Sequence, residues 1–283
     1  MPELPEVESV RRQLAPRLVG RCVVALPYEP QERFADLEFA VGRRIDRLDR
    51  RGKYLIAGLG RGMAGMERPP WGAGDCAFEL IMHLGMTGSF RFRSERGWAP
   101  DGYVRATLEL DDGSVLDFRD VRRFGRLCVV EAGDYSGIAT LAALGPEPLG
   151  EDFDPDRFYA ALAGSRMAVK PLLLTQRPVA GVGNIYADEA LWRARVNPRA
   201  RRVGRRRAHA LWAAIRDVLA ESIEREGTTF RDYRMVNGES GRNAGFLAAY
   251  GQAGRPCPRC GSTLVRAVVG GRGTTYCPCC QRY

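Results

Sequence analysis

The hydrophobic pattern of this chain changes once, and this change limits the fold more than any single motif does. From residue 21 to about 131, short apolar runs are separated by turn residues, as in Tyr54–Leu59 and Val104–Leu110. Asp112 and Gly113 lie between two such runs and favour a hairpin. From about residue 135 the spacing becomes helical, as in Ile185–Arg193 and Ala208–Glu226. The pattern predicts an α+β multidomain protein that begins with an antiparallel β-sandwich.

Other segments complete this prediction. Further strands are expected at Cys22–Leu26, Phe78–Met82, Ser89–Phe92, Val115–Phe118 and Leu127–Val130, and further helices at 5–18, Phe158–Leu162 and Leu172–Leu174. The first helix is predicted to end at Gly20, and its apolar face contains Val7, Val10, Leu14 and Leu18. Residues 61–76 are rich in Gly, Pro and Met and are expected to form a surface loop. We expect domains at 1–134, 135–250 and 251–283.

The C-terminal segment has the spacing of a metal site. Five of the eight cysteines lie after residue 256, which favours a local metal site over a disulfide framework. Cys257 with Cys260 and Cys277 with Cys280 form two pairs of equal spacing, typical of one structural Zn²⁺ with four thiolate ligands. Cys279 is a surplus thiol, so the spacing alone leaves the ligand set open. A glycine-rich hairpin between the pairs is expected to present Arg272, either to a phosphate or as an incidental turn residue.

The N-terminus carries a second chemical signal, because removal of the initiator Met1 would leave Pro2 as a free secondary amine. With an α-amino pKa near ~8, much of this amine is neutral at working pH and can attack an aldehyde-like carbon. The carboxylates of Glu3, Glu6 and Glu8 are acid/base candidates beside it. The plain alternative is a helix start, with acidic residues favoured by the helix dipole.

The charge of the chain indicates a polyanionic partner. Its formal net charge is +9, and only two of its 43 basic residues, Lys53 and Lys170, are lysines. Lysine can lose a proton and presents a compact charge, which arginine cannot do, so both lysines are functional candidates. No apolar run is long enough to span a membrane, and no signal peptide is recognisable, so we expect a soluble, cytoplasmic protein.

Three loops could contact DNA, although each is weak evidence alone. Gly181–Asn184 precedes a helix, where glycines admit a phosphate and Asn184 can cap. An arginine run from Arg199 to Arg207 follows it and would extend a phosphate-binding surface. Such runs are more often simply solvent-exposed charged surfaces. Met86, Arg122 and Phe124 lie in two glycine-containing loops and could fill the gap left by an extracted base. The plain alternative is that Met86 and Phe124 are core residues. His83, which follows a predicted strand, has the same alternative of a purely structural role.

Together these motifs make the chain resemble the bacterial formamidopyrimidine-DNA glycosylase family, also called 8-oxoguanine DNA glycosylase. The resemblance runs from Met1 to the last cysteine pair, and its motifs are Met1–Val7, Arg51–Leu55, His83–Gly88, Arg122–Gly125, Leu144–Leu149, Ala168–Pro171, Gly181–Ala187 and the zinc finger. The sister endonuclease VIII branch differs at Leu4, where it has glycine. The resemblance implies an N-terminal β-sandwich flanked by helices, a helix–two-turn–helix domain and a zinc-finger β-hairpin.

The implied activity is base-excision repair by a bifunctional DNA glycosylase and abasic-site lyase. Such an enzyme removes oxidised purines from duplex DNA through a Schiff base with the N-terminal proline, then cuts the strand by β,δ-elimination. The resemblance assigns catalysis to Pro2, Glu3, Glu6, Lys53 and Arg272. It assigns DNA contacts to His83, Met86, Arg122, Phe124, Lys170, Asn184, Tyr250 and Arg266. It also implies a monomer associated with the nucleoid through DNA, with no membrane partner.

The chain departs from the family pattern at three places. Val121 replaces a proline that is common before the wedge arginine, which is expected to loosen that loop. Asp101 stands where the family often has a DNA-contacting histidine, and residues 61–76 look like an insertion. The loop near 231–245, which the family uses to sense the oxidised purine, is divergent. An oxidised-pyrimidine glycosylase and a catalytically silent damaged-DNA-binding protein therefore remain as alternatives.

Overall fold

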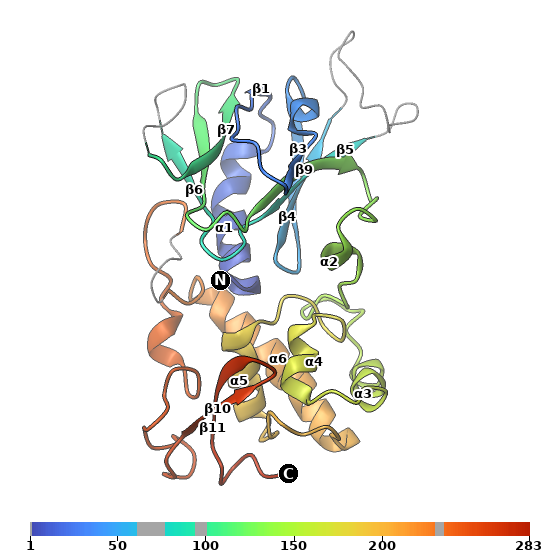
Figure 1. The fold of residues 1–283 in the computed structure, drawn as a ribbon, viewed down its shortest axis with the longest axis vertical. Coiled ribbons are helices and arrows are strands. Elements are labelled where there is room, and N and C mark those ends of the chain that lie inside the picture. Colours follow the sequence, from blue (N-terminus) through green and yellow to red (C-terminus); the bar gives the residue numbers. More distant parts are fainter. Residues whose placement is uncertain (1, 61–76, 94–100, 230–234) are drawn as a thin grey trace. The chain divides into compact units, whose positions relative to one another are not determined.

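The computed structural model describes residues 2–60, 77–93, 101–229 and 235–283 (Figure 1). The expected surface loop at 61–76 and part of the divergent loop near 231–245 therefore lie outside the described residues. The chain forms two compact units. The first contains Met1–Pro2, Glu6–Ala142 and Thr228–Gly241, and the second contains Glu3–Pro5, Ala143–Gly227 and Arg242–Tyr283.

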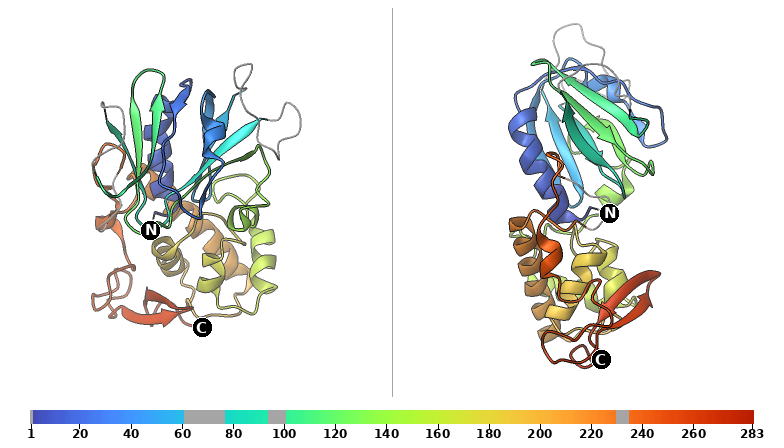
Figure 2. Two further views of the ribbon diagram at one scale, coloured as in Figure 1. Left: turned by 45° about the horizontal axis from the view of Figure 1, so that its top comes forward. Right: turned by 90° about the vertical axis from the view of Figure 1, so that its left-hand side faces the viewer.

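The first unit contains two β-sheets, as the sequence pattern predicts (Figures 1 and 2). The four-stranded sheet has the order β1-β7-β8-β6, with β1 at Val23–Ala25, β7 at Val104–Leu110, β8 at Val115–Arg119 and β6 at Ser89–Arg93. The five-stranded sheet has the order β2-β9-β5-β4-β3, with strands at Phe34–Ala35, Arg126–Glu131, Phe78–His83, Tyr54–Leu59 and Ile45–Arg51. Apolar residues of both sheets share one core, so the predicted β-sandwich is confirmed.

Helix α1, at Leu4–Leu18, adds its apolar face to this core. Val7, Val10, Leu14 and Leu18 recur every three or four residues, and each is at most 1% exposed. Truncating Leu14 or Leu18 to alanine would cost about 2–5 kcal/mol at such buried positions. The helix ends where Gly20 adopts a φ of 87°, a conformation that glycine tolerates best.

Two strands of the sandwich do not follow from apolar runs. Strand β3 pairs with β4, but its sequence is largely charged and only Ile45 and Leu48 are buried. It lies at the edge of its sheet, where charged side chains can reach water. Strand β2 has two residues and pairs with β9 in parallel, so the sandwich is not wholly antiparallel. The short helices η1, at Leu37–Ala40, and α2, at Ala139–Ala142, complete this unit.

The second unit is helical and ends in a two-stranded sheet. Its helices are α3 at Pro155–Ala163, α4 at Val169–Leu174, α5 at Asn184–Arg193, α6 at Arg205–Glu224 and η2 at Asn243–Phe246. Their apolar faces form a second core, which includes Leu4 from the chain start. The four predicted helical segments of this region are thus confirmed, with bounds that differ by a few residues at most.

The predicted glycine-rich hairpin is also present in this unit (Figure 2). Strands β10, at Val265–Val269, and β11, at Arg272–Tyr276, pair antiparallel with Val269 opposite Arg272. The two-residue turn requires positive φ at both positions, and Gly270 and Gly271 supply 57° and 73°. Among the described residues, no helix is both long and apolar enough to cross a membrane.

Candidate functional site

The carboxylate of Glu3 closes the N-terminal end of α5, within the second unit. Its Oε2 accepts the N–H groups of Gly183 at 2.8 Å and Tyr186 at 3.3 Å, and its Oε1 accepts that of Ile185 at 2.9 Å. A helix leaves these amides without internal partners, and the dipole favours an anion there. A Cβ on Gly183 would lie 2.2 Å from Cδ of Glu3, so glycine is required for this close approach.

The predicted capping role of Asn184 is wrong. Gly183 is the N-cap residue and Asn184 is the first residue of α5. The Asn184 side chain instead donates its Nδ2 to the carbonyl of Gly273, in strand β11, at 3.1 Å. The cap comes from Glu3, which is distant in the sequence, so a local motif could not reveal it.

Replacing Glu3 with glutamine should destabilise the second unit. An amide offers one acceptor oxygen in place of two, and its NH₂ group would face backbone N–H donors. Hydrogen bonds to charged groups contribute about 1.5–3 kcal/mol, so we expect Glu3→Gln to lower the free energy of unfolding by about that amount. Urea denaturation measures it. Glu226→Gln is the control, because it removes a carboxylate whose partner Arg242 is largely solvent-exposed. Equal stability of the two variants would contradict the capping role.

In the first unit, the other N-terminal candidates are buried. Pro2 is buried, and Glu6 accepts the backbone N–H of Thr228 at 2.7 Å. Lys53 is only 4% exposed and begins the return from β3 into β4, beside Gly52 at a φ of 56°. Only lysine, and not arginine, can lose its proton at accessible pH, so an arginine could not take the place of Lys53 as a proton acceptor.

His83, at the end of β5, has an environment that keeps its ring neutral. Its Nδ1 accepts the N–H of Gly85 at 3.1 Å, and its ring lies 4.5 Å from that of Tyr54. Burial, reinforced by the positive charges of Lys53, Arg126 and Arg33, lowers the pKa of His83 to about 4. With Nδ1 accepting, the remaining proton is on Nε2, so the ring presents one neutral N–H donor.

The depressed pKa of His83 predicts a pH-dependent stability. The unfolded ring titrates near ~6.5, so by pH ~5 it is largely protonated, whereas the folded ring is still mostly neutral. Stability is therefore complete above pH ~6.5 and falls below it. We expect a loss of about 2 kcal/mol by pH ~4, less than the full shift implies because the ring is partly exposed. Denaturation from pH 4 to 8 measures this slope.

His83→Gln should remove that part of the slope. The matched control is His209→Gln, which removes the second histidine of the chain from a surface site beside Asp156. If both variants retain the slope of the parent protein, His83 does not titrate as its surroundings imply.

The structure brings together the two loops that carry Met86, Arg122 and Phe124. Asp120 is buried and accepts Thr87 Oγ1 at 2.5 Å and Gly125 N–H at 2.7 Å. The backbone N–H of Arg122 donates to Thr87 Oγ1 at 3.0 Å, and its guanidinium lies 4.9 Å from the Phe124 ring centroid. Arg122 and Phe124 are exposed and Met86 is partly buried. Asp120 thus holds the loop in which Val121 replaces a proline.

Asp101 has a local partner that explains an acid at this position. Its carboxylate accepts Arg119 Nε at 2.6 Å and the backbone N–H of Tyr103 at 2.9 Å. These interactions lower the pKa of Asp101, the Arg119 bond first. An acid in this setting stabilises its own turn.

Lys170 and its neighbours form a buried polar network in the second unit. The Lys170 side chain is 0% exposed, lies 2.6 Å from Asp188 Oδ1 and donates to Thr274 Oγ1 at 2.8 Å. Tyr250 is partly buried, and burial raises its pKa. Arg266 and Arg272 are exposed on the hairpin. Sequence reasoning missed Asp188, because an acid inside an amphipathic helix gives no local indication of a buried partner.

The four paired cysteines form one cluster. The thiol sulfurs of Cys257, Cys260, Cys277 and Cys280 all lie within 4.8 Å of one another. Trp192 Nε1–H donates to Cys257 Sγ at 3.4 Å and the Cys280 N–H to Cys277 Sγ at 3.3 Å, as suits thiolate acceptors. Cys279 is exposed and stands outside the cluster. A set of four thiolates with no open position fits one structural zinc ion.

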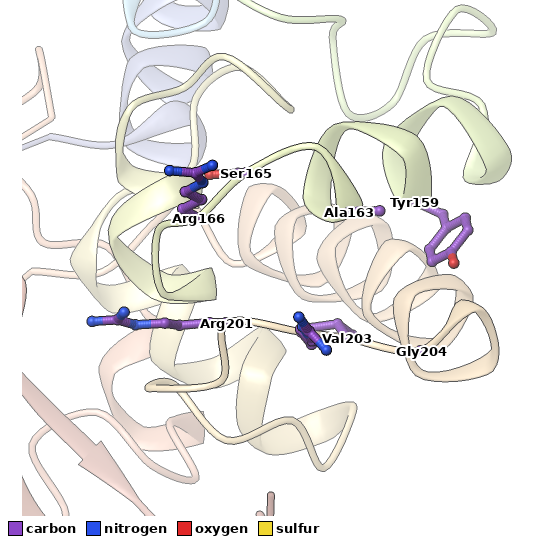
Figure 3. Close-up of a pocket in the computed structure, with 8 residues that line it drawn as sticks. Tyr159, Ala163, Ser165, Arg166, Arg201, Val203 and Gly204 are labelled. Atoms are coloured by element: carbon purple, nitrogen blue, oxygen red, sulfur yellow. The ribbon is translucent and has the colours of Figure 1, made fainter.

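A basic pocket of about 610 Å³ lies between α3 and the segment that leads into α6 (Figure 3). Its lining includes Tyr159, Ala163, Ser165, Arg166, Arg201, Arg202, Val203 and Gly204. Among the described residues, the three arginines of this pocket have no ion-pair partner. The neighbouring Arg205, in contrast, lies 2.8 Å from Asp156 Oδ1. Arg166 and Arg201 project on the side away from Tyr159 (Figure 3).

Three family models match consecutive parts of the chain. The formamidopyrimidine-DNA glycosylase N-terminal domain matches residues 1–127, and the formamidopyrimidine-DNA glycosylase H2TH domain matches residues 144–234. A zinc finger found in FPG and IleRS matches residues 254–282. The third match confirms the structural zinc predicted from the cysteine spacing.

Relatives cover the whole chain. Formamidopyrimidine-DNA glycosylases of Deinococcus radiodurans and Thermus thermophilus are 44% and 45% identical over 99% of this chain and 97% and 98% of their own lengths. The Thermus thermophilus crystal structure aligns with a TM-score of 0.87 over 99% of this chain and 98% of its own. The Lactococcus lactis enzyme bound to DNA with an abasic site aligns at 0.83, with 33% identity over 99% and 100% of the two chains.

Proposed function

Because this chain belongs to the formamidopyrimidine-DNA glycosylase family, we propose that it is a base-excision-repair DNA glycosylase and abasic-site lyase. Its substrates are oxidised purines in duplex DNA, namely 8-oxoguanine and formamidopyrimidines. The observation that supports this most strongly is similarity along the whole chain, including the N-terminal segment and the zinc finger, to enzymes of that name. The structure of one relative holds DNA with carbocyclic 8-oxo-G.

The proposed nucleophile is the amine of Pro2. Its lone pair forms a bond to C1′ while the bond from C1′ to the base breaks, and the electron pair leaves with the base, which takes up a proton. Opening of the sugar ring then gives an iminium between C1′ and the proline nitrogen. The positive charge makes the C2′ proton acidic, so its loss expels the 3′ phosphate, and a second elimination expels the 5′ phosphate.

The other catalytic assignments rest on the family resemblance and on position. Glu3 assists ring opening and base departure, and Glu6 helps hold the nucleotide. Lys53 takes part in β-elimination and Arg272 in δ-elimination. The burial of Lys53 and the exposure of Arg272 on its hairpin suit these roles. The proposed DNA-contacting residues are His83, Met86, Arg122, Phe124, Lys170, Asn184, Tyr250 and Arg266.

We propose three domains for the chain. We place a catalytic β-sandwich domain at 1–134, a helix–two-turn–helix DNA-binding domain at 135–250 and the zinc finger at 251–283. Four cysteines hold the zinc, which fixes the hairpin and takes no part in the reaction. We infer a monomer that acts in the cytoplasm, associated with the nucleoid through DNA.

The test is a comparison of duplexes that carry 8-oxoguanine, thymine glycol or no lesion. We expect release of 8-oxoguanine, measured by mass spectrometry, and strand ends that carry phosphate on both sides of the gap. Borohydride should trap a covalent adduct on the 8-oxoguanine duplex. Faster release of thymine glycol would favour an oxidised-pyrimidine glycosylase, and binding without base release would favour a silent damage-binding protein.

The unpaired arginines of the basic pocket are expected to contact DNA phosphates beyond the lesion. Each phosphate contact adds about 0.9 to the magnitude of the slope of log K against log salt. Arg201→Ser with Arg202→Ser should therefore flatten the slope by about one to two. Fluorescence anisotropy from 50 to 300 mM salt measures it. Arg205→Ser is the control, because Arg205 is paired with Asp156; an equal change there would mean that only net charge matters.

A further inference from the structure

The outer edge of strand β11 is bonded by side chains instead of by a third strand. The carbonyl of Gly273 accepts Asn184 Nδ2 at 3.1 Å and Lys170 Nζ at 3.1 Å. The backbone N–H of Thr275 donates to Asp188 Oδ2 at 2.9 Å. In a two-stranded hairpin these groups would otherwise lack protein partners, and buried backbone groups require them. Residues of α4 and α5 therefore help to hold β11 in place.

Lys170 and Asp188 form the centre of this arrangement. The Lys170 ammonium has three N–H groups and three acceptors within 3.1 Å, which are Asp188 Oδ1, Thr274 Oγ1 and the Gly273 carbonyl. Lys170 is 0% and Asp188 1% exposed. The ammonium is therefore held inside the protein by one ion pair and two hydrogen bonds, two of these three contacts being to residues of β11.

The hairpin tip rests on the same helix. A Cβ on Gly270 would lie 2.5 Å from Cγ of Pro171, so the turn is packed closely against the residue that follows Lys170. The turn leads directly to Arg272, whose carbonyl accepts Thr274 Oγ1 at 3.0 Å. Thr274 therefore bonds both to Lys170 and to the backbone of the exposed arginine. These bonds hold the backbone at Arg272, whose side chain is exposed.

We infer that Asp188 is a positioning residue, which acts through Lys170 and through the Thr275 N–H to place Arg272 for δ-elimination. The inference rests on the proposed function of Arg272 in that step. The carboxylate neutralises the ammonium inside the protein and holds β11 at two points. Without it, the ammonium would be an unpaired buried charge, and it would turn toward water or draw the strand with it.

The test measures the ratio of δ- to β-elimination products on a duplex with one abasic site. Asp188→Asn keeps the shape of the side chain but removes its charge. We expect the ratio to fall by about tenfold or more, because a displacement near 1 Å can cost up to about a hundredfold. Borohydride trapping should still occur, and zinc content should stay at one per chain. An unchanged ratio would overturn the inference.

A double variant separates positioning from stability. Lys170→Met with Asp188→Leu removes both buried charges, and such replacements are often neutral for folding. It also removes the bonds to Gly273 and Thr275. We expect thermal stability to recover relative to Asp188→Asn while the product ratio stays low. Recovery of the ratio together with stability would show a merely structural role.

Two reference variants complete the design. Glu221→Gln removes the acid of a more exposed pair, with Arg193 on α5, and should leave the ratio unchanged. Arg272→Ala should lower the ratio at least as far as Asp188→Asn does. If Arg272→Ala has no effect, the proposed function of Arg272 is wrong; if it lowers the ratio and Asp188→Asn does not, only the positioning role is wrong.

Discussion

A protein that carries one extra uncleaved residue before Pro2 should lose strand cleavage by about a thousandfold or more. The extension converts the proline nitrogen into an amide, whose lone pair is delocalised into the carbonyl and is no longer nucleophilic. A thousandfold loss corresponds to about 4 kcal/mol of transition-state stabilisation, a modest figure for removal of a nucleophile. Single-turnover cleavage of an 8-oxoguanine duplex and the yield of borohydride-trapped adduct measure the loss.

The matched control is the same protein after a protease removes the extension and restores Pro2 as the first residue. Mass spectrometry of the N-terminus confirms both forms. Pro2→Gly is a second variant: it keeps a primary amine, whose imine needs a proton to become cationic, so the trapped adduct should be lost or much reduced. Full activity of the extended protein would place the nucleophile elsewhere, with Lys53 the first candidate.

Removal of the zinc should unfold the C-terminal module and abolish δ-elimination. The module has a very small core of its own, formed by Cys257, Leu264 and Cys277. Structural zinc contributes about 10–16 kcal/mol in small zinc-finger peptides, far more than such a core can supply. Cys257→Ser or Cys277→Ser should therefore lose the metal, lower the affinity for DNA and leave the hairpin residue Arg272 unplaced.

Cys279→Ser is the matched control, because Cys279 is exposed and lies outside the cluster. It should retain one zinc per chain and full activity, with metal content measured by atomic absorption and binding by anisotropy. Trp192, which donates to Cys257, provides a local fluorescence signal for module unfolding. Loss of metal from Cys279→Ser would mean that the ligand set differs from the four clustered cysteines.

The sequence predicted those elements whose residues alternate or repeat clearly. Strands at Tyr54–Leu59 and Val104–Leu110 have the predicted bounds, because apolar runs between turn residues define both ends. The sequence does not predict strand β3, because five of its seven residues are charged. β3 forms because it pairs with β4. This tertiary contact outweighs the low strand propensity of its charged residues.

For the candidate site, the sequence predicts the features that depend on local spacing but not the contacts between distant residues. The cysteine pairs are local, so their spacing was sufficient to predict the cluster. The cap on α5 and the pairing of Lys170 join residues far apart in the chain, and a single sequence contains no distances. For this reason the sequence predicts a cap at Asn184, which is wrong, and gives no indication of Asp188. The excess of arginine marks Lys53 and Lys170 as unusual. It does not predict that both are buried.

That burial affects how the protein tolerates its own substrate. Strand breaks and abasic sites expose sugar aldehydes, which condense with accessible primary amines on any protein that stays close. Both lysines of this chain are at most 4% exposed, so its surface offers such aldehydes almost nothing to react with. Guanidinium groups supply the attraction to DNA without this hazard. A repair protein of this composition can remain on damaged duplexes without becoming cross-linked to them by accident.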